Sequence, residues 1–325
     1  MVDTTPTRLG QDNGAGGVLD LYLTTWSGEL INSYLERTVM LDKVRKRSVG
    51  PGKKTVTFDG IGDVGSGYHA AGEDILDPSN GLMQTPKHGR TTISIDSKLV
   101  CPIFIDDLDE FINHYDVRSE YMTKMGRRLA RVTDSNLMQL VILGATQASG
   151  ITDDHPGGLV VTDADAATNG ASLLASIEEI SATFDEKDVP EEDRFVVLKP
   201  RQYNLLVNET DLLNRDFGGS NGVFSEGDVR KAWGMTLLKS NHLPTTSIAS
   251  TVADAVNGPR NEYGVDASNT VAIAFQRGAI GHIEAKGMTF EVEYQMQRQG
   301  HFMLASQAVG SNFLLPAACA QIKTA

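Results

Sequence analysis

The 325-residue sequence predicts an α+β fold, and three observations support that class. Two alternating, Thr-rich runs at 55–59 and 90–96 enclose a stretch rich in glycine and proline, as in a long two-stranded hairpin. One long helical pattern follows at about 115–143. After residue 170, patterns typical of helices and of buried strands alternate, which predicts a compact α/β subdomain.

The composition argues against several kinds of site. The formal net charge is −13, whereas a nucleic-acid binder needs clustered lysine and arginine. Two cysteines cannot form a disulfide framework or a Cys-rich zinc site. The nearest approach to a ligand cluster is His114, Asp116 and Glu120, whose spacing does not place them on one helical face. No apolar run approaches the length of a membrane span. We therefore expect no metal, no cofactor and no membrane partner.

The N-terminal part predicts an arm followed by a helix. Residues 1–17 are polar and lack the basic-then-apolar order of a signal peptide. Residues 18–40 have apolar side chains every three to four positions, which predicts an amphipathic helix. These apolar positions include Leu19, Leu23, Trp26, Leu30 and Tyr34.

The segment 49–96 predicts a projecting hairpin, because its middle has too few large apolar groups for a core of its own. It contains Gly60-Ile-Gly62-Asp-Val-Gly65, the spelling of a dinucleotide-binding turn. That chemistry needs a helix directly after the glycines to hold the pyrophosphate, and "SGYHAAGEDILDPSNG" does not predict one. A lone hairpin is marginal in water, so we expect this ribbon to rest on another surface, such as a neighbouring subunit.

The pattern at about 115–143 predicts one long spine helix. Its apolar face includes Val117, Tyr121, Met125, Leu129 and Val132. The four carboxylates of 106–110 precede it and fit a solvated acidic helix start rather than a calcium loop. The opposite face carries a basic stripe, which consists of Lys124, Arg127, Arg128 and Arg131. Such a stripe is typical of a solvated face, and alternatively of contact with an acidic or polyanionic partner.

The α/β part is predicted to contain helices at 172–184 and 201–208 and buried strands before Pro200, at 234–244 and at 269–276. An amphipathic strand at 288–296 and a short strand within 312–325 complete it. Polar loops are predicted at 214–227 and 245–269. The first loop spells G-x-S-x-G around Ser220, but a nucleophile elbow needs a strand before it and a helix after it. We expect no catalytic residue there.

Several segments resemble the major capsid protein of short-tailed phages similar to coliphage T-seven. The most specific is "NHYDVRSEY" at 113–121. The collinear matches are "YHAAGED" at 68–74, "ISIDSKLVCPIFIDDLDEFINHYDVRSEY" at 93–121, "VPEEDRFVVLKPRQY" at 189–203, "VRKAWGMTLLKSNHLP" at 229–244 and "RGAIGHIEAKGMTFEVEY" at 277–294. The resemblance extends from about residue 19 to residue 322, nearly the whole chain.

The resemblance implies the tailed-phage capsid fold of the Hong Kong 97 type. It implies an N-terminal arm (1–48), an extended loop (49–96), a peripheral domain with the spine helix (97–160 and 276–308) and an axial domain (161–275 and 309–325). In that setting the subunit-interface candidates are Tyr68, Glu73, Asp74 and Lys87. Some relatives crosslink subunits through a lysine of this loop. Lys87 is the one lysine there after Lys54, no catalytic glutamate can be placed, and we expect no crosslink.

The resemblance also implies a virion protein that assembles in the host cytoplasm. Its hexamers and pentamers close into an icosahedral shell around double-stranded DNA, which is held without sequence-specific binding. The implied partners are copies of itself, a scaffolding protein and a portal at one vertex. A decoration protein is a further partner that this family allows. The basic stripe would contact scaffolding protein or packaged DNA. The alternatives are a cellular compartment of the same fold, similar to encapsulins, and a soluble α/β enzyme that uses the Gly60 loop.

Overall fold

The computed structural model describes residues 38–50, 52–62, 64, 66–77, 86–108, 117–149, 155–209, 222–223, 228–229, 231–248 and 263–324. They divide between two compact units. The strand unit contains residue 38 and the described parts of 97–131 and 286–309. The α/β unit contains those of 39–96, 132–285 and 310–325. Helix α3 and strands β14 and β15 each continue from one unit into the other.

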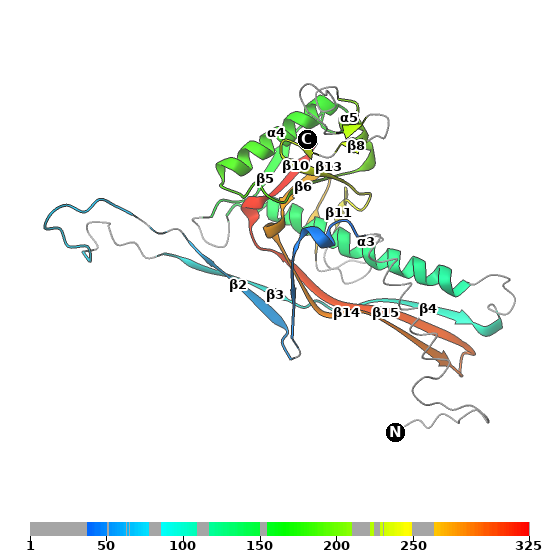
Figure 1. Cartoon of the computed structure of the whole chain (residues 1–325). Helices are drawn as coiled ribbons and strands as arrows, with labels where there is room; N and C mark the ends of the chain where they lie inside the picture. Colours follow the sequence, from blue (N-terminus) through cyan, green and yellow to red (C-terminus); the bar gives the residue numbers. More distant parts are fainter. Residues whose placement is uncertain are drawn as a thin grey trace. The chain divides into compact units, whose positions relative to one another are not determined.

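The α/β unit is built on a six-stranded sheet in the order β5-β16-β13-β6-β10-β9. Figure 1 labels β5, β6, β10 and β13 of this sheet. Its strands are β5 (Leu159–Thr162), β6 (Arg194–Leu198), β9 (Lys231–Ala232), β10 (Met235–Lys239), β13 (Thr270–Gln276) and β16 (Cys319–Lys323). The central strands β6 and β13 pair antiparallel, and every residue of β6 is buried. Continuous apolar strands of this kind occur where both faces of a sheet are covered.

Two helices of this unit begin at residues that suit a helix start. Helix α4 (Gly170–Glu186) follows Asn169, whose side-chain oxygen accepts a hydrogen bond from the Ala171 nitrogen at 3.1 Å. Helix α5 (Pro200–Val207) begins with proline, which needs no hydrogen bond for its nitrogen in the first turn. Their buried side chains join those of 137–145 in α3 and of the sheet in one core.

The predicted hairpin is confirmed. Strands β2 (Thr55–Ile61) and β3 (His88–Ser94) pair antiparallel over seven positions, from Thr55↔Ser94 to Ile61↔His88. Before the hairpin, the short 3₁₀ helix η1 (Leu41–Lys43) leads into β1 (Arg45–Ser48), which pairs parallel with the start of β14. All four residues of β1 are exposed.

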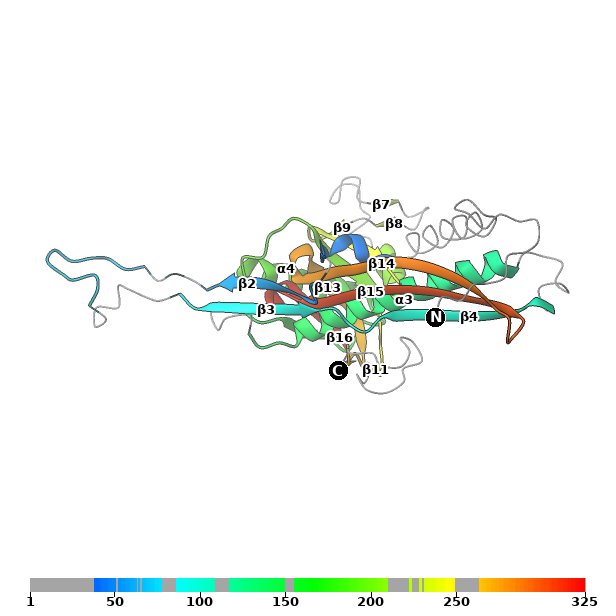
Figure 2. The same ribbon diagram turned by 90° about the horizontal axis from the view of Figure 1, so that it is seen from below.

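A four-stranded sheet has the order β1-β14-β15-β4, and Figure 2 shows its long strands side by side. These are β4 (Leu99–Asp106), β14 (Ile280–Gln295) and β15 (Gly300–Phe313). Strands β4 and β15 pair antiparallel from Leu99↔Gln307 to Asp106↔Gly300. Two 3₁₀ helices, η4 (Arg277–Ala279) and η5 (Pro316–Ala318), precede β14 and β16.

The spine helix is confirmed as α3 (Val117–Ala145), two residues longer at its end than predicted. Its apolar stripe is buried at Met125, Leu129 and Val132. Helices α4 and α5, strands β6, β10, β13 and β16, and the strand at 288–295 also match their predictions. No helix in the described ranges is long and apolar enough to cross a membrane.

Other predictions were wrong. The predicted loop at 245–269 contains β11 (Ser247–Ile248) and β12 (Val265–Asp266), which pair with each other. The loop at 214–227 contains β7 (Gly222–Val223), paired with β8 (Asp228–Val229). Residues 38–40, the predicted end of the first helix, are not helical, and 18–37 lie outside the described residues. Strands β4, β15 and the first half of β14 were not predicted.

Candidate assembly surfaces

The hairpin ladder continues one step beyond its strands. The Gly62 nitrogen, directly after β2, donates a hydrogen bond to the Lys87 carbonyl oxygen at 2.7 Å. Across the ladder, Arg90 and Asp59 lie opposite each other and form an ion pair of 2.6 Å. Gly60 thus belongs to a strand, and the described residues between 62 and 86 form no helix. Gly65 lies outside the described residues.

Two consecutive turns shape the described tip of the hairpin. The Glu73 nitrogen donates to the Ala70 carbonyl at 3.1 Å, and Gly72, with a φ of 90°, occupies the position that requires a left-handed residue. The Glu73 carboxylate accepts from the Ala70 nitrogen at 2.9 Å. In the next turn, the Asp74 carboxylate accepts from the Leu76 nitrogen at 3.0 Å. Glu73 and Asp74 therefore fix the backbone of the tip.

Large apolar side chains of the same segment are exposed to solvent. They are Ile61 (64% exposed), Val64 (66%), Tyr68 (103%), Ile75 (56%) and Leu76 (71%). An ordered backbone that displays this many apolar side chains is typical of a surface that binds another protein. Of the candidate interface residues, Tyr68, Glu73 and Asp74 share this tip, while Lys87 is an exposed residue directly before the returning strand β3.

The base of the hairpin packs against other elements of the α/β unit. Ile93 of β3, Ile283 of β14 and Leu314 form a buried apolar cluster, with Val56 and Phe58 of β2 packed on it. The backbones also approach closely at Gly310, where a Cβ atom would lie 2.1 Å from the Ser94 carbonyl oxygen. A side chain at position 310 would separate β15 from the hairpin.

A chain of polar contacts supports the same base. The Tyr263 hydroxyl donates to the Asp96 carboxylate and accepts from the Ser311 nitrogen at 3.2 Å. The Ser311 hydroxyl lies 2.8 Å from Nδ1 of His282. Burial raises the pKa of Tyr263 well above its usual value, and the Asp96 charge adds to that shift. Burial lowers the pKa of His282 to about 4, with Lys46 as a second cause. His282 is therefore neutral at pH 7.

Two arginines of β1 lie over one aromatic ring of the hairpin. The guanidinium carbons of Arg45 and Arg47 are 5.7 and 5.6 Å from the centroid of the Phe58 ring. Cations at this distance from an aromatic face are attracted by the ring quadrupole. The contacts align β1 with β2 and leave the arginines exposed.

The strand unit displays a second set of exposed apolar side chains. It consists of Val100 (47% exposed), Phe104 (39%), Leu108 (64%), Tyr294 (44%) and Met296 (70%). Phe104 is paired in register with Phe302 of β15. Asp106 ends β4 and its carboxylate accepts from the Leu108 nitrogen at 2.8 Å, the contact expected at an acidic helix start. Residues 109 and 110 of that predicted start lie outside the described residues.

The basic stripe lies on the solvent side of α3. Lys124, Arg127 and Arg131 are exposed and Arg128 is half-buried. Lys124 pairs with Glu120 at 3.6 Å, one helical turn earlier. The structure thus brings the four residues together as the spacing predicted, and one of them is part of a local ion pair.

Neither cysteine nor any described cluster suggests a reactive or metal centre. Burial raises the pKa of the Cys319 thiol to about 12 and also raises that of Cys101. No group of three or more histidine, cysteine or acidic side chains in the described ranges could hold a metal ion. His114, Asp116 and Ser220 lie outside those ranges.

Sequence reasoning missed the exposed apolar set of the strand unit. Val100 and Phe104 of this set lie in β4. That strand was not recognised because Pro102 and the polar flanks interrupt its pattern. The β-branched and aromatic residues of "LVCPIFID" were the available signal.

Comparison with known proteins gives consistent matches over nearly the whole length. A family model described as "Gp10A-like: Major capsid protein" matches residues 58–323. The major capsid protein of Enterobacteria phage T3 is 25% identical, with 97% of this chain and 95% of that protein aligned. The major capsid protein of Escherichia phage T7 is 23% identical, with 95% and 93% aligned.

A solved structure agrees with these relatives. The capsid structure of the cyanophage P-SCSP1u contains a chain that is 32% identical to this one, with a TM-score of 0.77. The alignment covers 99% of both chains.

Proposed function

The chain belongs to the Gp10A-like family of major capsid proteins and is a structural subunit of a tailed-phage shell, and from this premise we propose how it assembles. Copies associate as hexamers and pentamers that close into an icosahedral shell. The shell encloses double-stranded DNA without reading its sequence. A net charge of −13 supports this, because a broadly basic wall would hold the packed DNA tightly.

The observation that carries the proposal is the ordered, apolar tip of the hairpin. Its five exposed side chains include Tyr68 and Leu76, which are 103% and 71% exposed. Full burial of one such side chain contributes about 1.5–3 kcal/mol. Burying them against a neighbouring copy would therefore supply much of the association free energy of a subunit.

The exposed apolar set of the strand unit is the surface that we propose receives this tip. Phe104, Tyr294 and Met296 belong to it, and each is between 39% and 70% exposed. A neighbour's hairpin laid across these side chains would remove both apolar sets from water at once. The association free energy of each contact is modest, but the contact is repeated by every copy in the shell.

We assign the family's domains to this chain as predicted from its sequence. The arm is 1–48, the extended loop 49–96, the peripheral domain 97–160 with 276–308, and the axial domain 161–275 with 309–325. The interface candidates Tyr68, Glu73, Asp74 and Lys87 lie in the extended loop. Glu73 and Asp74 act by holding its turns.

Assembly takes place in the host cytoplasm on a scaffolding protein, with a portal at one vertex and a decoration protein as a further possible partner. The basic stripe Lys124, Arg127, Arg128 and Arg131 would face a polyanionic partner inside the shell. Its exposed cations support this part of the proposal, because they are not buried within the described part of the subunit.

The experiment expresses the chain alone and with its scaffolding protein and examines the product by negative-stain electron microscopy. Closed shells or capsomer rings are expected, whereas small discrete particles would contradict the proposal. A variant that lacks 60–86 should fold, because the core cluster of the α/β unit contains no residue of that segment, and should fail to form shells. Normal shells from this variant would exclude the hairpin as the main contact.

The contents of purified particles test the two alternatives. A phage shell isolated from infected cells contains DNA, whereas an encapsulin-like compartment contains protein cargo. An enzyme that uses the Gly60 loop would bind a dinucleotide as a small oligomer.

A further inference from the structure

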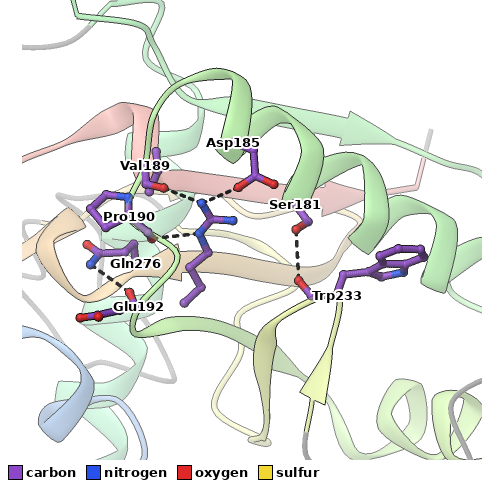
Figure 3. A network of polar contacts seen from close by, with 8 residues as sticks. Ser181, Asp185, Val189, Pro190, Glu192, Trp233 and Gln276 are labelled. Atoms are coloured by element: carbon purple, nitrogen blue, oxygen red, sulfur yellow. Dashed lines mark hydrogen bonds and ion pairs between the residues drawn. The ribbon is translucent and has the colours of Figure 1, made fainter. Parts of the chain in front are cut away.

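A cavity of about 720 Å³ opens on the surface of the α/β unit beside Trp233. Its lining comes from the end of α4, the turn 191–193, the start of β6 and the β9–β10 connection. The polar lining residues are Ser181, Asp185, Glu191, Glu192, Asp193, Arg194, Lys231 and Thr236. Figure 3 shows Trp233 and the polar network at this place.

Arg194 stabilises the wall of the cavity. Its guanidinium is engaged within the subunit and is not available to a ligand. Its guanidinium donates to the carbonyl oxygens of Val189 at 2.5 Å and Pro190 at 3.0 Å, and pairs with Asp185 at 2.8 Å (Figure 3). It also lies 5.7 Å from the centroid of the Phe184 ring. Because the side chain is 4% exposed, its charge serves to fix the turn that carries Glu191 and Glu192.

Trp233 is displayed by a strained turn. Ala232 of β9 pairs with Met235 of β10, so Trp233 and Gly234 form a two-residue connection, and both have positive φ angles of 48° and 77°. A bulky residue in this conformation costs free energy that glycine or asparagine would not. The Ser181 hydroxyl donates to the Trp233 carbonyl at 3.1 Å, and the side chain is 51% exposed. The fold thus holds a large aromatic group in water.

The turn that lines one side of this cavity is strongly acidic. Residues 185–193 contain six acidic residues and Lys187. The ammonium of Lys187 is directed at the carbonyl oxygens of Gly157 and Gly158, at 2.9 and 3.3 Å. Glu191 and Glu192 are exposed. The carboxylates of this turn are suited to lysine or arginine side chains through ion pairing. Figure 3 shows the Trp233 indole directed away from Asp185 and Glu192, so it lines a separate part of the cavity.

The chain itself carries a segment of opposite charge. Residues 43–58 contain six basic and no acidic residues, in a chain whose net charge is −13. The six are Lys43, Arg45, Lys46, Arg47, Lys53 and Lys54. Lys53, Lys54 and all of β1 are exposed at the base of the hairpin. Within the described part of one copy, no ion pair joins this segment to 185–193.

We propose that the Trp233 cavity of one subunit binds the basic segment 43–58 of an adjacent copy in the shell. This inference rests on the proposed assembly and adds to it a second, electrostatic contact, separate from the apolar tip. Copies that each carry a charge of −13 repel one another, so complementary patches of this kind favour contacts between them. Glu191 and Glu192 pair with the cations, and Trp233, which also lines the cavity, adds an aromatic contact.

Tryptophan fluorescence tests whether the cavity is covered. Trp26 is the other tryptophan of the chain, so a Trp26→Phe variant reports on Trp233 alone. In unassembled subunits we expect free quenching by acrylamide, and in shells a quenching constant lower by about threefold with emission shifted to shorter wavelength. Equal quenching in both states would overturn the proposal.

A charge exchange tests the partner. Glu191→Lys with Glu192→Lys should raise the critical concentration for shell formation about tenfold at low salt, and Lys53→Glu with Lys54→Glu should do the same. A chain with all four substitutions should assemble near the wild-type concentration. The matched control is Glu178→Lys with Glu179→Lys, the same charge change on an exposed part of α4 outside the cavity.

The possible outcomes distinguish a failure of this inference from a failure of the proposed assembly. If the wild-type chain forms no shells, the proposed assembly fails. If it forms shells and the Glu191 and Glu192 variant assembles equally well, the cavity is not a subunit contact. If the fourfold variant stays defective, the basic segment is not its partner, and the inference is wrong. Circular dichroism of each unassembled variant checks that the subunit remains folded.

Discussion

Asp134 and Val39 lie 95 positions apart, and the buried carboxylate of Asp134 accepts a hydrogen bond from the Val39 backbone nitrogen at 2.8 Å. The Met40 nitrogen donates to the same carboxylate at 3.2 Å, and Nδ1 of His242 lies 3.2 Å from it. One side chain of the spine helix therefore holds both the start of the described chain and the segment after β10. Asp134 is 0% exposed, so water cannot replace these partners.

Replacing Asp134 should destabilise the subunit. Asp134→Ala leaves two backbone donors without their acceptor, and we expect the free energy of unfolding to fall by about 3 kcal/mol. Asp134→Asn should cost less, because the amide oxygen can still accept from one of them. Chemical denaturation of the unassembled subunit measures both. Glu178→Ala, on the exposed face of α4, is the control, and an Asp134→Ala loss no larger than this control would contradict the expectation.

Substitutions at the hairpin tip should affect assembly and leave folding intact. Tyr68→Ser and Leu76→Ser remove exposed apolar side chains, so the unfolding free energy of the subunit should not change. Each should weaken subunit association by about 2 kcal/mol, about thirtyfold, if the side chain is buried by a neighbour. Light scattering against protein concentration measures this. Ser66→Ala, an exposed polar position before the tip, should assemble as the wild type does.

His282 should make the subunit less stable in mild acid. Its folded-state pKa of about 4 lies below the ordinary value of 6.5, so between these values the unfolded chain binds a proton that the folded chain does not. The contribution of neutral His282 to the free energy of unfolding is therefore fully present above about pH 6.5. It falls by about 3 kcal/mol as the pH drops toward 4. Denaturation of the wild type and of His282→Asn at pH 7, 5.5 and 4.5 measures this. Asparagine retains a polar group toward Ser311 but does not titrate in this range. If the free energy of unfolding falls equally with pH in both proteins, a group other than His282 causes the acid sensitivity.

Neutralising the basic stripe should reduce the DNA content of the shells or disturb shell formation. With glutamine at Lys124, Arg127, Arg128 and Arg131, we expect poorer DNA retention if the partner is DNA, and aberrant or missing shells if it is the scaffolding protein. The charge-retaining control replaces the three arginines with lysine. Normal assembly and normal DNA content in the glutamine variant would show that the stripe is only a solvated face.

Local patterns in the sequence were sufficient for the elements with regular periodicity. The three-to-four spacing around Met125 and Leu129 predicted α3, and the alternation on each side of the glycine-rich stretch predicted β2 and β3. Strand β15 was missed because "GHFMLASQAVGSNF" mixes glycine, serine and apolar residues without alternation. Its conformation is imposed by pairing with β4, which a local pattern does not report.

The assembly surfaces were predictable in part. The sequence indicated the hairpin and the positions of Tyr68, Glu73 and Asp74, and it placed the basic stripe on one helical face. It did not indicate the Trp233 cavity, because a tryptophan in a left-handed turn contradicts the usual preference for asparagine or glycine. Nor did it indicate the pairing of Tyr263 with Asp96, which are 167 positions apart.

The two turns at the hairpin tip also bear on how fast a shell can grow. Because hydrogen bonds within 70–77 already fix the backbone there, a docking subunit does not have to search for the bound shape of its loop. The rate of addition at a growing edge should then depend on collision and orientation, as for rigid partners. A wrongly placed copy can leave in the shape in which it arrived and dock again, so errors can be corrected before the shell closes.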